Sequence, residues 1–371
     1  MAEALQAEQH RNLKLQRVLL IDLGAHFGGV ENYLVSLAQL LEGEVDLYAL
    51  CVLPELARRL NDAGAKTTLL PTLGGGLKPL RFVIALILLP FLILRHRIQI
   101  IQVNGFLEAT LMLPARLLGC RTVYTRHGPF EMENYRWYRD PLKYLPRLLA
   151  RISVHLATEA VCVSETVGIG VRKIRPRVNV TVIPNWLAGQ DEPQELKMAS
   201  AEGLRLVCAS RLERYKGIHL VIEAMRDMVG VQLTVVGDGP YRAALEEMAN
   251  GLPVEFVGFQ KDMAKYYGMA DIFIMPSLGP EGLPMSSLEA MGRGLPCVLS
   301  DLPVHKEITN DGKGALLFEA GSTESLRKVL QEMVDDPASR AWIASEGYRI
   351  VGERYTADSV RKRYVRVFGA A

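Results

Sequence analysis

The sequence contains no apolar run long enough to cross a membrane. The longest such run covers residues 82–94 and contains Pro90, whereas a membrane-spanning helix needs about 20 apolar residues. The run therefore predicts either a crossover helix buried against a sheet or a helix lying in the membrane interface, with basic neighbours toward lipid headgroups. Residues 1–16 are polar and show no cleavage-like site, so we expect no signal peptide.

Cysteine is scarce, and its spacing is not that of a zinc site. The cysteines are odd in number and stand far apart in mostly apolar surroundings, which is typical of reduced, buried thiols in a cytoplasmic protein. The sequence also lacks a D-x-D pair suited to bridging a divalent ion. We therefore expect no metal site and no cofactor. The five cysteines are Cys51, Cys120, Cys162, Cys208 and Cys297.

The chain has little net charge, +2 at pH 7, but its two halves differ. Residues 1–190 carry 22 basic and 15 acidic residues, a difference of +7, and residues 191–371 carry 21 and 26, a difference of −5. A basic first half favours contact with an anionic surface such as phospholipid headgroups or nucleic acid. The same counts also fit charges scattered over a solvated surface.

Short apolar, β-branched runs alternate with longer helical patterns along the whole chain. Continuous apolar strands between helices are typical of parallel sheets buried on both faces. Two such series occur, and a length of 371 residues suits two domains. The predicted fold is therefore α/β, with two doubly wound, Rossmann-like domains facing each other across a cleft. The polar stretch 186–203, which contains glycine and proline, predicts the break between them.

The richest group of candidate site residues follows the strand predicted at residues 271–276. Ligands of such folds bind beyond the carboxyl ends of the strands, and here Glu281 sits in the loop while Glu289 lies two turns into the next helix. The main-chain N–H groups between them suit a diphosphate, and Glu289 suits a ribose. Alternatively, the two glutamates are a helix cap and a surface charge. These donor-site candidates are Glu281, Gly282, Leu283, Met285 and Glu289.

Two further loops of the second half end strands on the same side. Arg211 and Lys216 stand five residues apart beside a glycine, and together they can neutralise a leaving diphosphate. Asp238 lies in a glycine loop that suits a base or a ribose. Taken singly, the two cations fit surface charges, and the Asp238 loop fits a plain turn.

The first half offers a glycine loop and a histidine. The loop at residues 24–29 includes Gly28 and Gly29, which let a phosphate or sugar approach the backbone, but its G-x-x-x-G-G spacing differs from the dinucleotide pattern and disfavours a dehydrogenase. His127 directly follows a strand and is expected to face Glu281, although a lone histidine is more often structural.

Together these motifs resemble the retaining glycosyltransferases of the GT-B fold, specifically glycosyltransferase family 4. The resemblance covers nearly the whole chain through GGVEN, SRLERYKG, VVGDGP and the E-x7-E pair, in that order. It implies an acceptor-binding domain over residues 1–187 and a nucleotide-sugar-binding domain over residues 188–352. The remaining residues, 353–371, would form a helix that packs back on the first domain.

The resemblance also implies roles for the site residues. Arg211 and Lys216 would bind the donor diphosphate, and Glu289 would bind the ribose. Glu281 would contact the transferred sugar, with His127 beside the reacting centre. The glycines that would approach the donor phosphate or sugar are Gly28 and Gly29.

The predicted function is transfer of a hexose-type sugar from a nucleoside diphosphate to a hydroxyl acceptor, with the anomeric configuration kept and no metal required. The alternatives are a sugar-nucleotide epimerase or phosphorylase on this architecture, or a non-catalytic subunit of a polysaccharide assembly complex. The expected partners are a nucleotide-sugar donor and a glycan or lipid-linked acceptor, not nucleic acid. A cytoplasmic protein is expected, and the basic-aromatic run at residues 135–147 adds the option of peripheral binding to the inner face of the plasma membrane.

Overall fold

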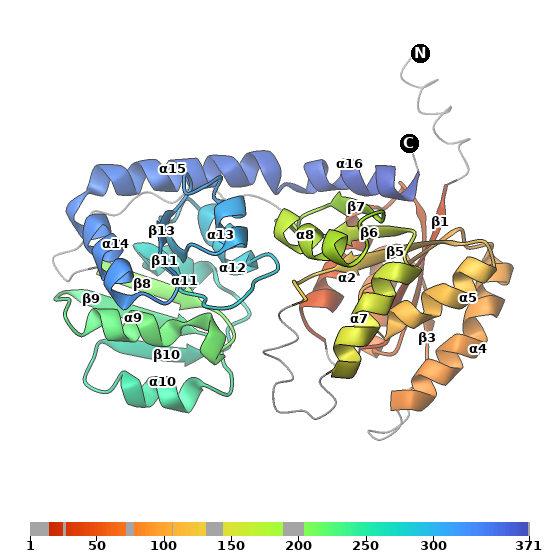
Figure 1. Cartoon of the computed structure of the whole chain (residues 1–371), viewed down its shortest axis with the longest axis horizontal. Coiled ribbons are helices and arrows are strands. Elements are labelled where there is room, and N and C mark those ends of the chain that lie inside the picture. Colours follow the sequence, from red (N-terminus) through yellow and green to blue (C-terminus); the bar gives the residue numbers. More distant parts are fainter. Residues whose placement is uncertain are drawn as a thin grey trace, which may run out of the picture.

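The chain forms two lobes, each built on a parallel sheet with helices on both of its faces (Figure 1). The computed structural model describes residues 15–24, 27–71, 78–105, 107–130, 144–187 and 204–369. The predicted α/β class with two doubly wound domains is confirmed. The expected domain boundary at residues 187 and 188 coincides with the start of segment 188–203, which lies outside the described residues.

The first sheet is parallel throughout, in the order β3-β2-β1-β4-β5-β6-β7. Its central strands are apolar and buried because helices cover both faces. The strands are β1 (Arg17–Asp22), β2 (Asp46–Cys51), β3 (Lys66–Leu69), β4 (Ile100–Val103), β5 (Arg121–Arg126), β6 (Glu159–Cys162) and β7 (Asn179–Val182).

The helices of the first lobe are divided between the two faces of this sheet. One buried cluster contains apolar residues of α2 (Gly29–Leu40), α3 (Pro54–Asp62) and α16 (Ala357–Phe368). The opposite cluster continues into the second lobe. Its first-lobe helices are α4 (Lys78–His96), η1 (Glu108–Leu111), α5 (Met112–Leu117), α7 (Tyr144–Leu156) and α8 (Glu165–Ile174).

The second sheet is also parallel, in the order β10-β9-β8-β11-β12-β13. Its strands are β8 (Leu204–Ala209), β9 (Val231–Val236), β10 (Val254–Gly258), β11 (Ile272–Met275), β12 (Cys297–Ser300) and β13 (Leu316–Phe318). Its helices are η2 (Arg214–Lys216), α9 (Ile218–Met225), α10 (Arg242–Met248), α11 (Ala264–Met269), α12 (Met285–Met291), α13 (Pro303–Ile308), α14 (Thr323–Asp335) and α15 (Pro337–Arg354).

The last two helices join the lobes along one side of the molecule (Figure 1). Helix α15 lies on the second lobe, and α16 continues onto the first. The Thr356 side chain caps the start of α16 by accepting a hydrogen bond from Ser359 N. Further along α16, the Tyr364 and Tyr33 hydroxyls are hydrogen-bonded in the buried cluster that α2, α3 and α16 form on one face of the first sheet. The chain therefore returns to the first lobe, and the two helices link the lobes along this side of the molecule.

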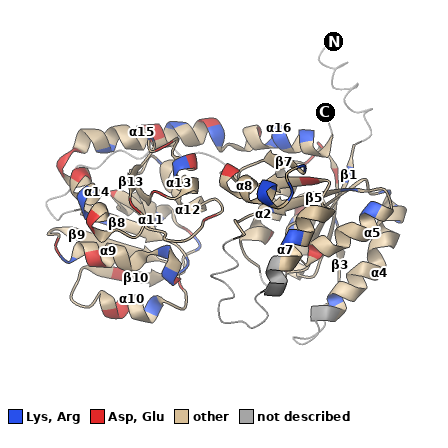
Figure 2. Ribbon diagram, viewed as in Figure 1, with Lys and Arg blue, Asp and Glu red and all other residues tan. Residues whose placement is uncertain are grey.

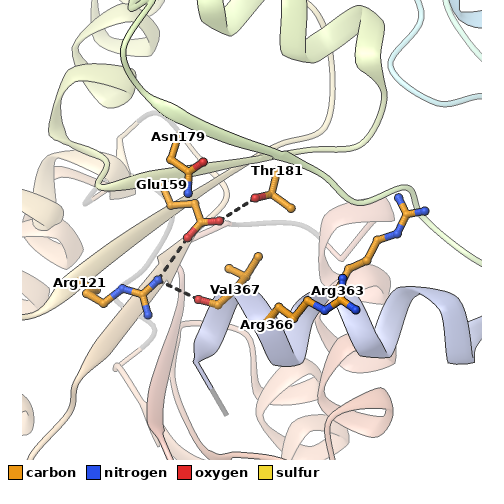
Figure 3. A pocket seen from close by; sticks show the side chains of 7 residues that line it. All are labelled: Arg121, Glu159, Asn179, Thr181, Arg363, Arg366 and Val367. Carbon is orange, nitrogen blue, oxygen red and sulfur yellow. Dashed lines mark hydrogen bonds and ion pairs between the residues drawn. The ribbon is translucent and has the colours of Figure 1, made fainter. Parts of the chain in front are cut away.

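A cavity of about 330 Å³ lies where α16 meets the amino ends of β5, β6 and β7 (Figure 3). Buried Glu159 accepts hydrogen bonds from Arg121 and Thr181, at 3.2 and 2.7 Å. Arg121 also donates to the Val367 carbonyl at 2.9 Å, which caps the end of α16. These hydrogen bonds hold α16 on the sheet at the amino ends of the strands, which is the edge opposite their carboxyl ends.

The apolar run at residues 82–94 lies within the single helix α4, which continues through Pro90. One side of the helix packs on the sheet through Ala85, Leu89 and Ile93, as expected of a crossover helix. In the part of the chain that the structure describes, no helix is long and apolar enough to span a membrane.

Candidate active site

The two lobes touch where loops at the carboxyl ends of their strands meet. Ser164, after β6, donates a hydrogen bond from Oγ to the Gly282 carbonyl at 2.8 Å. A Cβ on Gly282 would lie 1.9 Å from the His127 carbonyl oxygen. Only glycine fits this approach, so the loop containing Glu281 is pressed directly against the loop containing His127.

The Glu307 carboxylate makes a second contact between the lobes, at the amino end of helix α8. Glu307, in α13, accepts hydrogen bonds from the main-chain N–H groups of Glu165 and Thr166, at 2.7 and 3.1 Å. These groups lie in the first turn of α8, where the helix dipole favours an anion. Glu307 therefore links the second lobe to the first beside the Gly282 contact.

Lys216 and Glu281 form the centre of the site. Lys216 Nζ lies 2.6 Å from Glu281 Oε1, and both side chains are nearly buried. The Ser277 hydroxyl donates to the same oxygen at 2.7 Å. The loop carrying Lys216 reaches this position because Gly217 adopts φ +70° and packs on the Pro276 carbonyl, where a Cβ would come within 1.9 Å.

A buried hydrogen-bond network holds Ser277 in position. The Ser300 hydroxyl donates to the Ser277 carbonyl at 2.7 Å, and His305 Nδ1 lies 2.7 Å from the Ser300 carbonyl oxygen. Because a carbonyl can only accept, His305 Nδ1 carries the proton. Burial lowers the pKa of His305. This network holds the Glu281 partner in place, and nothing in the sequence around Ser300 indicated it.

Arg211 and Lys216, which are expected to act together on a diphosphate, have different surroundings. Both residues follow β8, but the Arg211 side chain is mostly exposed and pairs with Glu213 at 3.2 Å. It makes no ion pair with Glu281 in the described residues. Lys216 is therefore fixed in the site, whereas Arg211 lies at its rim.

The loop before α12 presents unpaired main-chain donors. Pro284 is the N-cap residue, and the helix begins at Met285. Within the described ranges, the N–H groups of Gly282, Leu283 and Met285 donate no hydrogen bond, although Gly282 and Leu283 are buried. Buried N–H groups nearly always have partners, so this loop has the donors that an anion would need.

Glu289 and Asp238 have different surroundings. Tyr267 donates from its hydroxyl to Glu289 Oε2 at 2.9 Å, and burial raises the pKa of Glu289. Asp238 is exposed and pairs with Arg242 at 3.3 Å. Its loop packs on the basic loop, because Leu212 N donates to the Asp238 carbonyl at 2.9 Å.

His127 is held as a neutral side chain. Its Nε2 lies 3.1 Å from Asn104 Oδ1, and the edge of the Tyr33 ring packs on it with the centroids 4.6 Å apart. Burial, with a smaller contribution from Arg126, lowers the pKa of His127 to about 4. Since Asn104 Oδ1 accepts, Nε2 carries the proton and Nδ1 remains an acceptor. The Asn104 Nδ2 group is buried and has no hydrogen-bond partner among the described residues.

The glycine loop of the first lobe stands beside three carboxyl groups that sequence reasoning did not group. Gly28 N donates to Glu31 at 2.8 Å and Gly24 N donates to Asp22 at 3.1 Å. Burial raises the pKa of Asp22 to about 7, with further contributions from Glu31 and Glu108. Burial also raises the pKa of Glu108. Gly29 lies beside Gly28 with open space around its Cα, whereas residues 25 and 26 lie outside the described residues.

No group of three or more His, Cys, Asp or Glu side chains could hold a metal ion in the described portion of the chain. The five cysteines are free and buried, and burial raises the pKa of Cys208 to about 12. The predicted buried thiols are therefore confirmed. In the basic-aromatic run, residues 135–143 lie outside the described residues, as do the side chains of residues 144–147.

Comparison with known proteins identifies the family. The family model described as Glycosyltransferase Family 4 matches residues 27–187, and the model described as Glycosyl transferases group 1 matches residues 203–336. The chain belongs to glycosyltransferase family 4. The resemblance inferred from the motifs is thereby confirmed, and both lobes contribute to it.

Curated glycosyltransferases are similar to part of this chain. The lipopolysaccharide core biosynthesis glycosyltransferase LpsE of Rhizobium meliloti is 27% identical over 164 residues, covering 43% of this chain and 48% of that protein. The GDP-mannose-dependent monoacylated alpha-(1-6)-phosphatidylinositol monomannoside mannosyltransferase of Corynebacterium glutamicum is 32% identical over 174 residues, covering 41% of this chain and 45% of that protein. The chain thus matches about half the length of these curated relatives.

The overall architecture matches that of GT-B glycosyltransferases. HepE of Anabaena, solved in complex with UDP, is 19% identical with a TM-score of 0.78, and 96% of this chain and 100% of that chain are covered. Sucrose-phosphate synthase of Thermosynechococcus elongatus is 18% identical with a TM-score of 0.77 and the same coverage. At such identities the likeness concerns the fold alone, and it confirms the predicted GT-B class.

Proposed function

We propose that this family 4 protein transfers a hexose-type sugar from a nucleoside diphosphate to a hydroxyl acceptor, with retention of anomeric configuration. The observation that carries the proposal is the buried Lys216–Glu281 pair beside the unpaired N–H groups of Gly282, Leu283 and Met285. A cation and main-chain donors at one point suit a diphosphate. The close contact of Gly282 with the His127 carbonyl brings the first lobe next to these groups.

The donor diphosphate would lie between the two loops of the second lobe. Lys216 supplies a compact charge, and the N–H groups of Gly282, Leu283 and Met285 supply hydrogen bonds. Arg211, now paired with Glu213 at the rim of the site, would add a second charge to the bound diphosphate. These groups stabilise the negative charge that develops as the diphosphate leaves, so we propose that no metal ion is required.

The carboxylate of Glu281 would hold the transferred sugar. Glu289 and Asp238 would hold the nucleoside part of the donor. Glu281 Oε1 accepts hydrogen bonds from Lys216 and Ser277, whereas Glu281 Oε2 accepts none from any described residue. That oxygen is the one available to a sugar hydroxyl. Glu289, aligned by Tyr267, would accept from the ribose.

The first lobe would receive the sugar and the acceptor. Neutral His127 and the unpaired Asn104 Nδ2 can hydrogen-bond to hydroxyl groups. The carboxyl groups beside Gly28 and Gly29 repel a phosphate but accept hydrogen bonds from hydroxyls. We therefore assign this glycine loop to the sugar rather than to the phosphate.

Retention would follow from departure and attack on one face of the sugar. The bond between the anomeric carbon and the phosphate oxygen breaks, the acceptor oxygen bonds to the same carbon, and the acceptor proton passes to the leaving phosphate. The acceptor we propose is a lipid-linked or cell-envelope glycan. The support is the names of relatives, which include lipopolysaccharide core biosynthesis glycosyltransferases.

A panel of nucleotide sugars tests the proposal. The purified chain is incubated with UDP-, GDP-, ADP- and TDP-linked hexoses in EDTA, and release of nucleoside diphosphate is measured. We expect hydrolysis of one donor class without added metal. Hydrolysis of none, or a strict need for magnesium or manganese, contradicts the proposal; an epimerised donor or dependence on inorganic phosphate supports the alternative enzymes.

A further inference from the structure

Three neighbouring helices cover one face of the first sheet. Helices α4, α5 and α7 follow β3, β4 and β5, and they pack on the same buried cluster, as right-handed crossovers in one direction require. Arg116, in α5, donates to the Leu156 carbonyl at the end of α7, at 3.4 Å. The outward sides of these helices therefore belong to one surface, here called the outer apolar face (Figure 1).

This face exposes large apolar side chains at helical spacing. Along α4 they recur every three or four residues, which places them on one side of the helix, opposite the side packed on the sheet. Ile87 and Leu94 are 69% and 68% exposed, and Leu117, in α5, is 81% exposed. The exposed apolar residues are Leu80, Val83, Leu86, Ile87, Phe91 and Leu94 in α4, Leu113 and Leu117 in α5, and Leu148 and Ile152 in α7.

The charges on the face are all of one sign. Helices α4, α5 and α7 contain no Asp or Glu, and no acidic residue occurs between positions 63 and 107. Figure 2 shows only basic residues coloured along these three ribbons. The described basic residues of these helices are Arg81, Arg95, Arg116 and Arg151.

We propose that the outer apolar face docks on an anionic phospholipid surface, with α4 lying in the interface. Soluble monomers rarely expose large contiguous apolar patches, and this face exposes ten large apolar side chains. The apolar side chains can enter the boundary between headgroups and acyl chains, while the arginines beside them pair with lipid phosphates. Helix α4 rests on the bilayer with its other side fixed to the sheet. The face includes no residue of the donor site, so the inference is independent of the proposed reaction.

Vesicle flotation with the full chain tests this inference. The probes are phosphatidylcholine vesicles with or without about 30 mol % phosphatidylglycerol, an amount that gives a strongly negative surface. We expect the chain to float with the anionic vesicles and to be released by high salt, because the electrostatic contribution is screened. The double variant Ile87→Asp/Leu94→Asp should lower the partition coefficient at least about 10-fold. The variant Arg95→Glu/Arg151→Glu should weaken binding to the anionic vesicles.

A matched control uses apolar residues exposed elsewhere. Val229→Asp/Trp342→Asp changes two exposed side chains of the second lobe and should leave flotation unchanged. Thermal unfolding checks that all variants fold, and donor hydrolysis without vesicles should be unaffected by the α4 variant. The inference is overturned if the wild-type chain binds neither vesicle, or if Ile87→Asp/Leu94→Asp binds like the control. It is also overturned if light scattering without lipid shows a wild-type dimer that this variant dissociates, because the face would then join two copies.

Discussion

Lys216 Nζ lies 2.6 Å from Glu281 Oε1, although the two residues stand 65 positions apart in the sequence. Their side chains are only 13% and 7% exposed. Removing one member of such a pair leaves an uncompensated buried charge. The pair therefore fixes the basic loop after β8 to the loop that meets the first lobe at Gly282.

Lys216→Ala should abolish most of the donor chemistry. The change removes a charge-assisted contact and costs about 2 kcal/mol or more of transition-state stabilisation, or at least about 30-fold in kcat/KM. The control is Lys66→Ala, because Lys66 makes an equally short but exposed pair with Asp46, and its turnover should stay near that of the wild type. Equal turnover of the two variants would contradict the role given to Lys216.

Gly282→Ala should disrupt the contact between the lobes. The added Cβ would clash with the His127 carbonyl, a backbone atom that cannot rotate away. We expect loss of about 100-fold in donor turnover from misplacement of the two loops, together with a larger radius of gyration in solution scattering. Gly268→Ala is the control, since a Cβ there meets nothing within 4 Å. A fully active, equally compact Gly282→Ala chain would show that the contact is unnecessary.

Glu307→Ala should loosen the second inter-lobe contact. Two N–H groups at the start of α8 and the Thr166 hydroxyl lose their acceptor, which should lower the free energy of unfolding by about 1–3 kcal/mol. Urea denaturation measures the change. Glu246→Ala, which removes an exposed partner of Arg242, should cost less than about 0.5 kcal/mol. Equal free energies of unfolding of the two variants would contradict the role given to Glu307.

Asp22→Asn should change how stability depends on pH. The pKa of Asp22 is about 7 in the folded chain against an ordinary value of 3.8, so the wild type loses stability as pH rises between these values. The asparagine variant has no proton to lose and keeps a carbonyl for Gly24 N. Its stability relative to wild type should therefore grow by about 2–3 kcal/mol from pH 5 to pH 8. Urea denaturation at pH 5 and pH 8 measures the free energy of unfolding of both proteins. A difference between them that is the same at the two pH values would contradict this prediction.

The sequence predicted where the site lies because parallel strands bring their following loops to one edge. Glu281, Lys216 and His127 each lie in a segment that connects a strand to the next helix, so these segments could be placed from the strand pattern alone. The E-x7-E pair also fell on the predicted loop and helix, with Glu281 before α12 and Glu289 inside it. These features depend on local order along the chain, which a single sequence shows.

Other features depend on which strands are neighbours, and the sequence does not specify that. Asp22 and Glu108 come together because β4 pairs with β1. His305 supports Ser277 because β12 lies beside β11. The ion pair of Arg211 with Glu213 likewise could not be read from the sequence. For residues 82–94 the pattern offered a buried or an interfacial helix, and α4 has both a packed side and an exposed apolar side.

Titration of nucleoside diphosphates into the wild-type chain and into Lys216→Ala, followed by calorimetry in EDTA, tests the central claim most directly. The account predicts that one nucleoside diphosphate binds the wild type without metal and binds the variant at least about 10-fold more weakly, since a charge-assisted phosphate contact is lost. Equal affinity for the two proteins, or no binding of any nucleoside diphosphate to the wild type, would contradict it.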